Sequence, residues 1–173
     1  MSNYGKKVDP LWLARFIPSL LGIGVAITVI GMVVPTPVLA ETSTRLAQKL
    51  DSLKKSEQRW LEVDLSEQQL TAWQGGTSRY QTIVSTGKPA TPTHSGIFSI
   101  QRKLLEDRMR GADYDVPNVP HVMYYDRGYA IHGAYWHNQF GTRVSHGCIN
   151  LPLAAAEEIY EWTPMGIPVI IHE

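Results

Sequence analysis

The sequence predicts a mainly β domain, either a β-sandwich or a partly closed β-barrel with one or two short helices, preceded by an N-terminal hydrophobic helix. Three observations predict this class. Apolar and polar residues alternate with a period of two from Trp60 onward. Glycine and proline divide the chain into short runs, and only one convincing helix follows, near the C-terminus. Many short strands with one helix are typical of two packed sheets or a barrel.

Residues 1–40 are predicted to be a signal peptide or an N-terminal membrane anchor. Three basic residues precede an uncharged stretch from Phe16 to Ala40, and Val38-Leu39-Ala40 has the spacing of a signal-peptidase site. The apolar stretch exceeds the roughly 7 to 15 residues of a signal core and approaches the ~20 that span a bilayer. Cleavage after Ala40 and membrane association through residues 16–39 therefore both stay open. Either way, the basic flank stays cytoplasmic, and we expect the remaining chain to be extracytoplasmic.

The charge balance and the absence of phosphate-binding glycine motifs exclude two classes of partner. The whole chain has no formal net charge, and removing residues 1–40 leaves 13 basic against 15 acidic side chains. Such a domain has no basic surplus for nucleic acid. Neither GxxxxGK[ST] nor GxGxxG occurs, so no nucleotide is expected. The sequence predicts no cofactor.

After residue 40 the chain is predicted to begin with a linker over residues 41–59. It is predicted to be helical, since Leu46, Leu50 and Leu53 recur at helical spacing among charged residues. Residues 60–173 are predicted to form one domain.

Short strands and turns follow in order. Gly75-Gly76 is a hairpin turn signal, and the glycine- and proline-rich stretch 87–96 is expected to be a loop. Residues 103–110 and the Pro117/Pro120 segment are expected to be a surface excursion. Asn150 is expected to cap a helix with Pro152 in its first turn. The expected strands cover residues 60–65, 70–74, 78–85, 97–100, 121–125, 129–131 and 167–171.

Cys148 is the only cysteine of the chain, within Ser145-His146-Gly147-Cys148-Ile149-Asn150. A single thiol in an exported domain is either a small buried apolar group or a nucleophile, because it cannot form an internal disulfide. The polar neighbours favour the nucleophile. His132 is the expected base, and the predicted helix start after Cys148 would favour a thiolate. Gly147 would let backbone N–H groups turn toward an oxyanion.

A structural metal site is the competing interpretation of the same residues. His132, His137, His146 and Cys148 provide four possible zinc ligands. The sequence disfavours this interpretation, because it has a single thiolate and neither a CxxC nor an HExxH motif. We therefore expect no metal.

Ile131-His132-Gly133, followed by the segment 145–150, resembles the active-site signature of the L,D-transpeptidase catalytic domain family of bacterial cell-wall enzymes. The resemblance extends over about Trp60 to His172, including the segments 63–70, 85–93 and 133–138. One departure is that only 12 residues separate His132 from Ser145, a shorter interval than in many members. The rim of the site is therefore expected to be trimmed.

The resemblance implies a fold of the L,D-transpeptidase catalytic type and a role for each matching residue. Cys148 matches the nucleophile, His132 its base, and Gly133 the residue whose carbonyl orients that base. The backbone N–H groups of His146, Gly147 and Cys148 match the oxyanion donors. Ser145 and Asn150 match positions that support the loop or the substrate.

The implied substrates are peptidoglycan stem peptides. Cys148 would attack the L-centre carbonyl of diaminopimelate in a tetrapeptide stem and release D-Ala. A diaminopimelate side-chain amine of a second stem would then take the acyl group, which makes a 3–3 cross-link. Trp136, Tyr124 and Tyr125 would line an acceptor groove, although strand aromatics more often belong to a core. We expect Trp136 and Tyr124 to bind substrate.

Three other functions remain open at this stage. An L,D-carboxypeptidase or cysteine peptidase would use the same nucleophile and base with water as acceptor. A non-catalytic wall-binding module would keep the motif for structure alone. A zinc-binding module would depend on the metal for its fold.

Overall fold

A computed structural model describes residues 37–173 of the chain, with side chains from residue 41 onward. The predicted signal or anchor therefore lies almost entirely outside the described residues. In the described part, no helix has the length and apolar character needed to cross a membrane. The elements in order are α1 (Pro37–Lys54), β1 (Arg59–Asp64), β2 (Gln69–Gln74), β3 (Thr77–Ile83), β4 (Gly96–Ser99), β5 (Arg102–Arg110), β6 (Asp115–Asp126), β7 (Tyr129–Gly133), β8 (Ile149–Leu151), α2 (Leu153–Trp162) and β9 (Pro168–His172).

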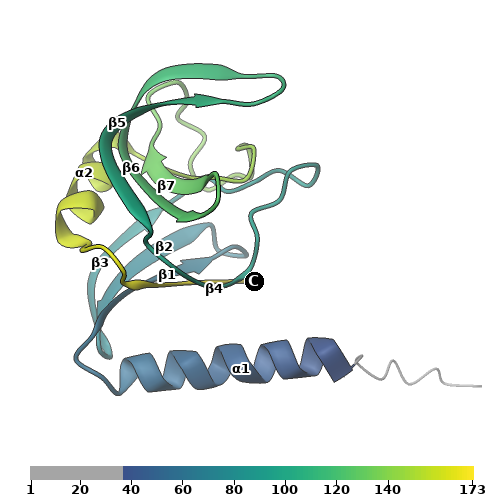
Figure 1. Cartoon of the computed structure of the whole chain (residues 1–173), viewed down its shortest axis with the longest axis vertical. Coiled ribbons are helices and arrows are strands. Elements are labelled where there is room, and N and C mark those ends of the chain that lie inside the picture. The colour runs from purple at the N-terminus through teal and green to yellow at the C-terminus, as the bar shows by residue number, and fades with distance from the viewer. Residues whose placement is uncertain (1–36) are drawn as a thin grey trace, which may run out of the picture. The chain divides into compact units, whose positions relative to one another are not determined.

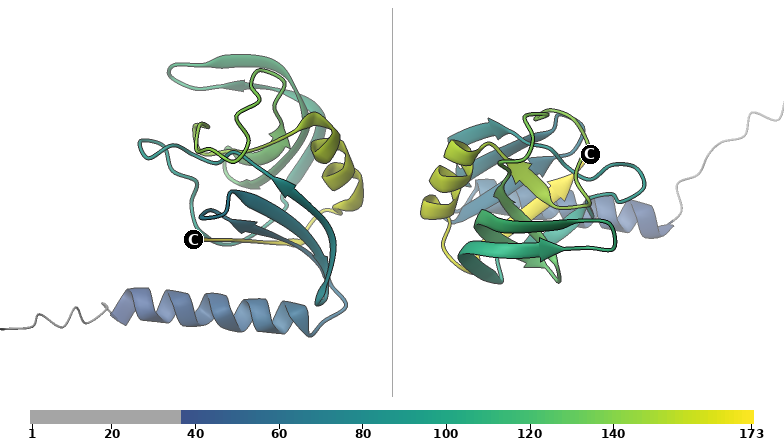
Figure 2. Two further views of the ribbon diagram at one scale, coloured as in Figure 1. Left: turned by 180° about the vertical axis from the view of Figure 1, so that it is seen from behind. Right: turned by 90° about the horizontal axis from the view of Figure 1, so that it is seen from above.

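The strands form two sheets, and no closed barrel forms among residues 37–173 (Figure 1). The first sheet has the order β3-β2-β1-β9-β4, and the second has the order β5-β6-β7-β8. The C-terminal strand β9 pairs in parallel with β1 and antiparallel with β4. The helix α2 packs on β6 and β7 at one side of the second sheet (Figure 2). The mainly β class is confirmed.

The main core lies between the two sheets and α2. Strand alternation explains it, because successive side chains of a strand point to opposite faces. Leu61 and Val63 of β1 face this core, as do Met123 and Tyr125 of β6 and Ile131 of β7. All five are fully buried.

The opposite face of the first sheet receives α1. Trp60 of β1 and Ile170 of β9 are fully buried there together with Leu53 near the end of α1. Leu46 and Leu50, on the same helical stripe, pack against this group. The helical spacing recognised in the sequence thus corresponds to an element that packs on the sheet.

The prediction of a surface excursion over residues 103–110 and Pro117/Pro120 is wrong, because this stretch forms the long β5–β6 hairpin (Figure 1). The charged residues and the two prolines of this stretch gave no recognisable strand pattern. The β6 residues paired with β7 begin at Met123, so Pro120 lies in the half of the strand that pairs with β5 alone. A proline is tolerated on such an open edge, since no ladder hydrogen bond is lost there.

The predicted Asn150 cap is also wrong. α2 begins at Leu153 after Pro152, with no side-chain cap, and Asn150 lies in β8 opposite His132. β8 therefore separates Cys148 from the helix. Because the field of a helix terminus falls off within about a turn, α2 does not provide the thiolate stabilisation expected from the sequence.

Candidate active site

The second sheet positions His132 and Cys148 on its face opposite the main core. Ile131 points into that core, so its neighbour His132 points to the other face. β7 and β8 are parallel, with Ile131 opposite Ile149 and His132 opposite Asn150. Cys148 directly precedes β8 and packs against the second apolar cluster, which includes Ala130. The imidazole and the thiol therefore share one face of the sheet.

A cavity of about 330 Å³ opens over this face. Its walls come from the β5–β6 hairpin, from β7, and from the loop between β7 and β8. The lining residues are Met109, Tyr114, Val116, His132, Trp136, His137, Gln139, Val144, Ser145, His146, Cys148 and Asn150.

His132 is held as a neutral base. Its side chain is only 2% exposed, and Nδ1 lies 3.0 Å from the carbonyl oxygen of Gly133. A carbonyl only accepts, so Nδ1 carries the proton and Nε2 keeps its lone pair. Burial lowers the pKa of His132 to about 4, although the Gly133 hydrogen bond acts in the opposite direction. The ring is therefore uncharged and free to accept a proton.

The Cys148 thiol is also neutral at rest. Burial raises its pKa above the ordinary value, and a hydrogen bond from the backbone of Ala130 only partly opposes this effect. A raised thiol pKa and a lowered imidazole pKa both favour the neutral pair over a thiolate–imidazolium pair. Attack by this sulfur therefore requires that its proton be removed as the new bond forms.

The turn before Cys148 is fixed by Gly147 and Ser145. Gly147 has φ +112°, and a Cβ at this position would lie 2.4 Å from Cε1 of Tyr129, so only glycine fits. The Gly147 N–H donates to Ser145 Oγ at 3.0 Å, and this hydroxyl donates to the Cys148 carbonyl at 2.5 Å. The Gly147 N–H is thus already bonded, and the residue contributes its backbone conformation.

The glycine- and proline-rich loop holds the cysteine segment from the other side. Ser85 and Asn150 exchange backbone hydrogen bonds of 2.9 and 2.8 Å. The Thr93 hydroxyl donates to the Gly147 carbonyl at 2.8 Å and accepts from the Gly87 N–H at 2.9 Å. The loop that the sequence places at residues 87–96 therefore braces the nucleophile.

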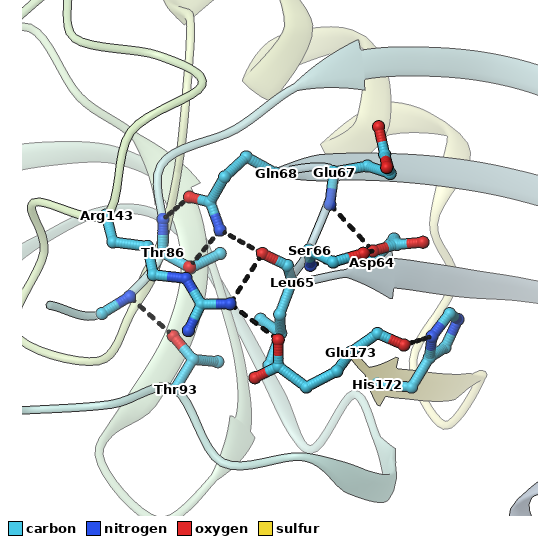
Figure 3. Close-up of polar contacts among 11 residues, drawn as sticks. Asp64, Leu65, Ser66, Glu67, Gln68, Thr86, Thr93, Arg143, His172 and Glu173 are labelled. Atoms are coloured by element: carbon cyan, nitrogen blue, oxygen red, sulfur yellow. Dashed lines mark hydrogen bonds and ion pairs between the residues drawn. The ribbon is translucent and has the colours of Figure 1, made fainter. Parts of the chain in front are cut away.

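A polar network, buried at Gln68 and Thr86, connects this loop to the β1–β2 turn (Figure 3). The Gln68 amide accepts from the Thr86 N–H at 2.9 Å and donates to the Leu65 carbonyl at 2.7 Å. Arg143 donates to the same carbonyl at 3.0 Å and to Glu173 at 2.7 Å. The β7–β8 loop is thereby tied to the first sheet.

His146 lies at the rim of the cavity. Its Nε2 is 3.1 Å from both Lys88 Nζ and Asp113 Oδ2, and its ring is 4.7 Å from that of Tyr114. Asp113 and Tyr114 belong to the connection between β5 and β6. The ring of His146 therefore joins the hairpin tip to the cysteine loop.

His137 and Asn150 form a second contact at the cavity wall. The Gln139 N–H donates to His137 Nδ1 at 3.1 Å, and Nε2 lies 2.9 Å from the Asn150 amide. Burial lowers the pKa of His137, so its ring is neutral. Trp136 is next to it, 40% exposed, with its ring centroid 5.8 Å from that of His132.

The structure brings most of the residues predicted from the sequence to one cavity. His132, Trp136, Ser145, His146, Cys148 and Asn150 line it, while Gly133 and Gly147 act through their backbone. Tyr124 does not line this cavity. It lies on a neighbouring one, with its hydroxyl donating to Asp107 at 2.8 Å. Tyr125 belongs to the main core.

No three His, Cys, Asp or Glu side chains in the described part of the chain are grouped to hold a metal ion. His137 and His146, two ligands of the zinc alternative, are engaged in the contacts described above.

Met109, Tyr114 and Val116 were missed as site residues. They come from the β5–β6 hairpin, which the charged sequence concealed. Val116, Val119 and Val122, spaced by three, gave no period-two pattern, since β6 pairs irregularly with β5 between Asp107 and Met109.

Comparison with known proteins identifies the family. The model of the family described as "L,D-transpeptidase catalytic domain" matches residues 58–171. An L,D-transpeptidase from Mycobacterium smegmatis is 26% identical, with a TM-score of 0.63 over 67% of this chain and 59% of that one. A mutant L,D-transpeptidase from Enterococcus faecium is 31% identical, with a TM-score of 0.64 over 68% of this chain and 50% of that one.

The catalytic domain of the E. faecium enzyme is 31% identical, with a TM-score of 0.61, and this chain covers 98% of it. The comparison with curated proteins gave no match. The chain thus spans 50–59% of the two longer relatives and nearly all of the isolated catalytic domain. It belongs to the L,D-transpeptidase catalytic domain family.

Proposed function

We propose that this chain is an extracytoplasmic peptidoglycan L,D-transpeptidase that transfers an acyl group through Cys148 and makes 3–3 cross-links. The observation that carries the proposal is the buried His132, whose Nδ1 is 3.0 Å from the Gly133 carbonyl. This contact leaves Nε2 as a base on the same face as the only thiol of the chain. Membership of a family that acts on stem peptides supports the choice of substrate.

In the first step, His132 Nε2 takes the proton of the Cys148 thiol while the sulfur attacks the L-centre carbonyl of diaminopimelate. The carbonyl oxygen becomes an oxyanion. Because the Gly147 N–H is bonded to Ser145, the N–H groups of His146 and Cys148 are the donors proposed for it. Collapse breaks the C–N bond, and the proton on Nε2 passes to the amine of the departing D-Ala, leaving a thioester.

In the second step, the side-chain amine of another stem gives a proton to Nε2 and attacks the thioester. The C–S bond breaks, and the thiol recovers its proton. Ser145 and Asn150 hold the cysteine segment, and Trp136 offers an aromatic surface at the entrance. We propose that the exposed Trp136 contacts the substrate.

The apolar N-terminus supports the proposed location. Residues 16–40 carry no charged side chain and follow three basic ones, as an export signal or an anchor requires. We propose that residues 60–173 form the catalytic domain outside the cytoplasmic membrane.

Product analysis tests this function. Disaccharide tetrapeptides are incubated with the protein, and the products are separated by mass. The proposal expects dimers linked between two diaminopimelate residues, with one D-Ala released for each. Tripeptide monomers alone, at high substrate concentration, would show an L,D-carboxypeptidase and overturn the transferase. Intact substrate would leave a non-catalytic wall-binding module.

A further inference from the structure

A second cavity, of about 460 Å³, is lined by four arginines. Arg102, Arg108 and Arg110 come from β5, and Arg127 comes from the turn between β6 and β7. The remaining walls are Met109, Tyr114, Tyr124 and Gly128. Nothing in the proposed first step uses these arginines.

The four guanidinium groups have three carboxylates among them. Asp115 makes close contacts with Arg108 and a longer one, of 3.5 Å, with Arg110. Asp107 is 3.7 Å from Arg102 and accepts a hydrogen bond from Tyr124. Asp126 pairs with Arg127 at 3.2 Å.

The cavity therefore carries a positive charge, although the chain from residue 41 onward has a negative net charge. Residues 41–173 carry 13 basic and 15 acidic side chains. Such a local reversal of sign favours an anionic ligand.

Arg102 and Arg110 have the most donor capacity left. Their ion pairs, at 3.7 and 3.5 Å, are beyond good hydrogen-bond distance. Their side chains are 59% and 64% exposed. The Arg102 guanidinium lies 4.3 Å from the ring centroid of Tyr124, which orients its plane and leaves its N–H edge available. A guanidinium held in this way suits bidentate binding of a carboxylate.

The arginine cavity adjoins the active site. Met109 and Tyr114 line both cavities. They also belong to the apolar cluster against which Cys148 packs. A ligand that reaches Cys148 across these two side chains can extend a distal carboxylate to the arginines.

We propose that the arginine cavity binds the carboxylates of the acceptor stem peptide, an inference that rests on the proposed transpeptidase function. The donor acyl chain is attached to the sulfur in the first cavity, so the second cavity is left for the second substrate. A cationic wall also lowers the pKa of an approaching ammonium group, which favours the neutral amine needed for attack. Water gains neither advantage, so the arginines favour cross-linking over hydrolysis.

The test measures binding of the acceptor separately from acylation by the donor. A disaccharide tripeptide, which has no D-Ala to release, serves as acceptor for the acyl-enzyme formed from a disaccharide tetrapeptide. We expect the double variant R102Q/R110Q to raise the KM for the tripeptide by about tenfold or more. Its rate of acylation by a carbapenem, used as a donor analogue expected to acylate Cys148, should match wild type. R79Q, which changes an exposed arginine of β3, is the matched control and should leave both values unchanged.

A tripeptide with amidated carboxylates provides a second arm that needs no variant. With wild type, its KM should rise as much as R102Q/R110Q raises that of the unmodified tripeptide. Combining the variant with the amidated peptide should add little. An unchanged tripeptide KM in R102Q/R110Q, or no effect of amidation, would overturn the acceptor site. Weaker binding of a wall phosphate polymer with unchanged tripeptide KM would overturn it also. Absence of dimers in wild type would instead refute the transpeptidase itself.

Discussion

Cys148 and His132 are uncharged at rest for a single physical reason, which is burial. Burial disfavours charge, so it raises the pKa of the thiol and lowers that of the imidazole. A protonated thiol resists oxidation better than a thiolate does. In a chain with one cysteine, this protects the sulfur until an electrophilic carbon reaches it.

The pH dependence of acylation follows from the same residue pair. The pKa of His132 is lowered from 6.5 to about 4, so its basic form persists to lower pH than that of an ordinary histidine. We expect the rate of carbapenem acylation to be retained as pH falls through 6.5 and to be lost only as pH falls through about 4. Stopped-flow measurement of adduct formation across this range is the check, and an acid limb near pH 6.5 would contradict a buried neutral base.

Alanine substitution of His132 and of His146 distinguishes the catalytic base from a residue at the cavity rim. His132→Ala should lower the acylation rate by about 10²- to 10⁴-fold, the usual contribution of a general base. His146→Ala should lower it less, since that ring contacts Lys88, Asp113 and Tyr114 at the cavity rim. Both rates are measured on variants with wild-type circular dichroism. The reverse order of effects would make His146 the base.

At the scale of elements, the strand β7, the turn before Cys148 and the loop at residues 87–96 together position the imidazole and the thiol. The sequence was sufficient for the strands with clear alternation, such as the run beginning at Trp60, and for the motif residues that meet at the cavity. It was insufficient for β5 and β6, whose charged residues and Pro120 resemble a surface loop. Asn150 was also predicted wrongly, as the cap of a helix. An Asn-Leu-Pro sequence resembles a helix start, and only the pairing of β8 with β7 reveals a strand.

The cysteine turn allows a matched pair of glycine substitutions. Gly147→Ala places a methyl group 2.4 Å from the Tyr129 ring at φ +112°, so the turn must shift and move Cys148. We expect at least about a tenfold loss of acylation rate together with a lower Tm. Gly128→Ala, where an added Cβ has nothing within 4 Å, should leave both near wild type. Equal effects of the two substitutions would show that the turn does not position the nucleophile.

At the scale of the whole described domain, the candidate catalytic residues lie on one sheet and the helix α1 packs on the other. His132 and Cys148 lie on the outer face of the second sheet, whereas α1 packs on the outer face of the first. The main core separates the two faces. The fold therefore places the candidate active site and α1 on different faces of the described domain.

This arrangement predicts that the packing of α1 affects stability and leaves chemistry unchanged. Leu53 is 1% exposed, so Leu53→Ala should lower the free energy of unfolding by about 2–5 kcal/mol. Leu105→Ala, at a side chain that is 68% exposed, should cost less than about 0.5 kcal/mol. Urea unfolding measures both, and the acylation rate of each folded variant should equal wild type. A Leu53→Ala cost no greater than that of Leu105→Ala would mean that α1 is only a tether.

The central claim is that Cys148 is the nucleophile. An L,D-transpeptidase 25% identical to this chain has been solved in complex with imipenem, which makes this carbapenem a suitable probe. Intact-mass spectrometry of the protein after incubation with imipenem tests the claim most directly. We predict a single covalent adduct on wild type and none on Cys148→Ala. An unmodified wild-type protein, or the same adduct on Cys148→Ala, would contradict the account.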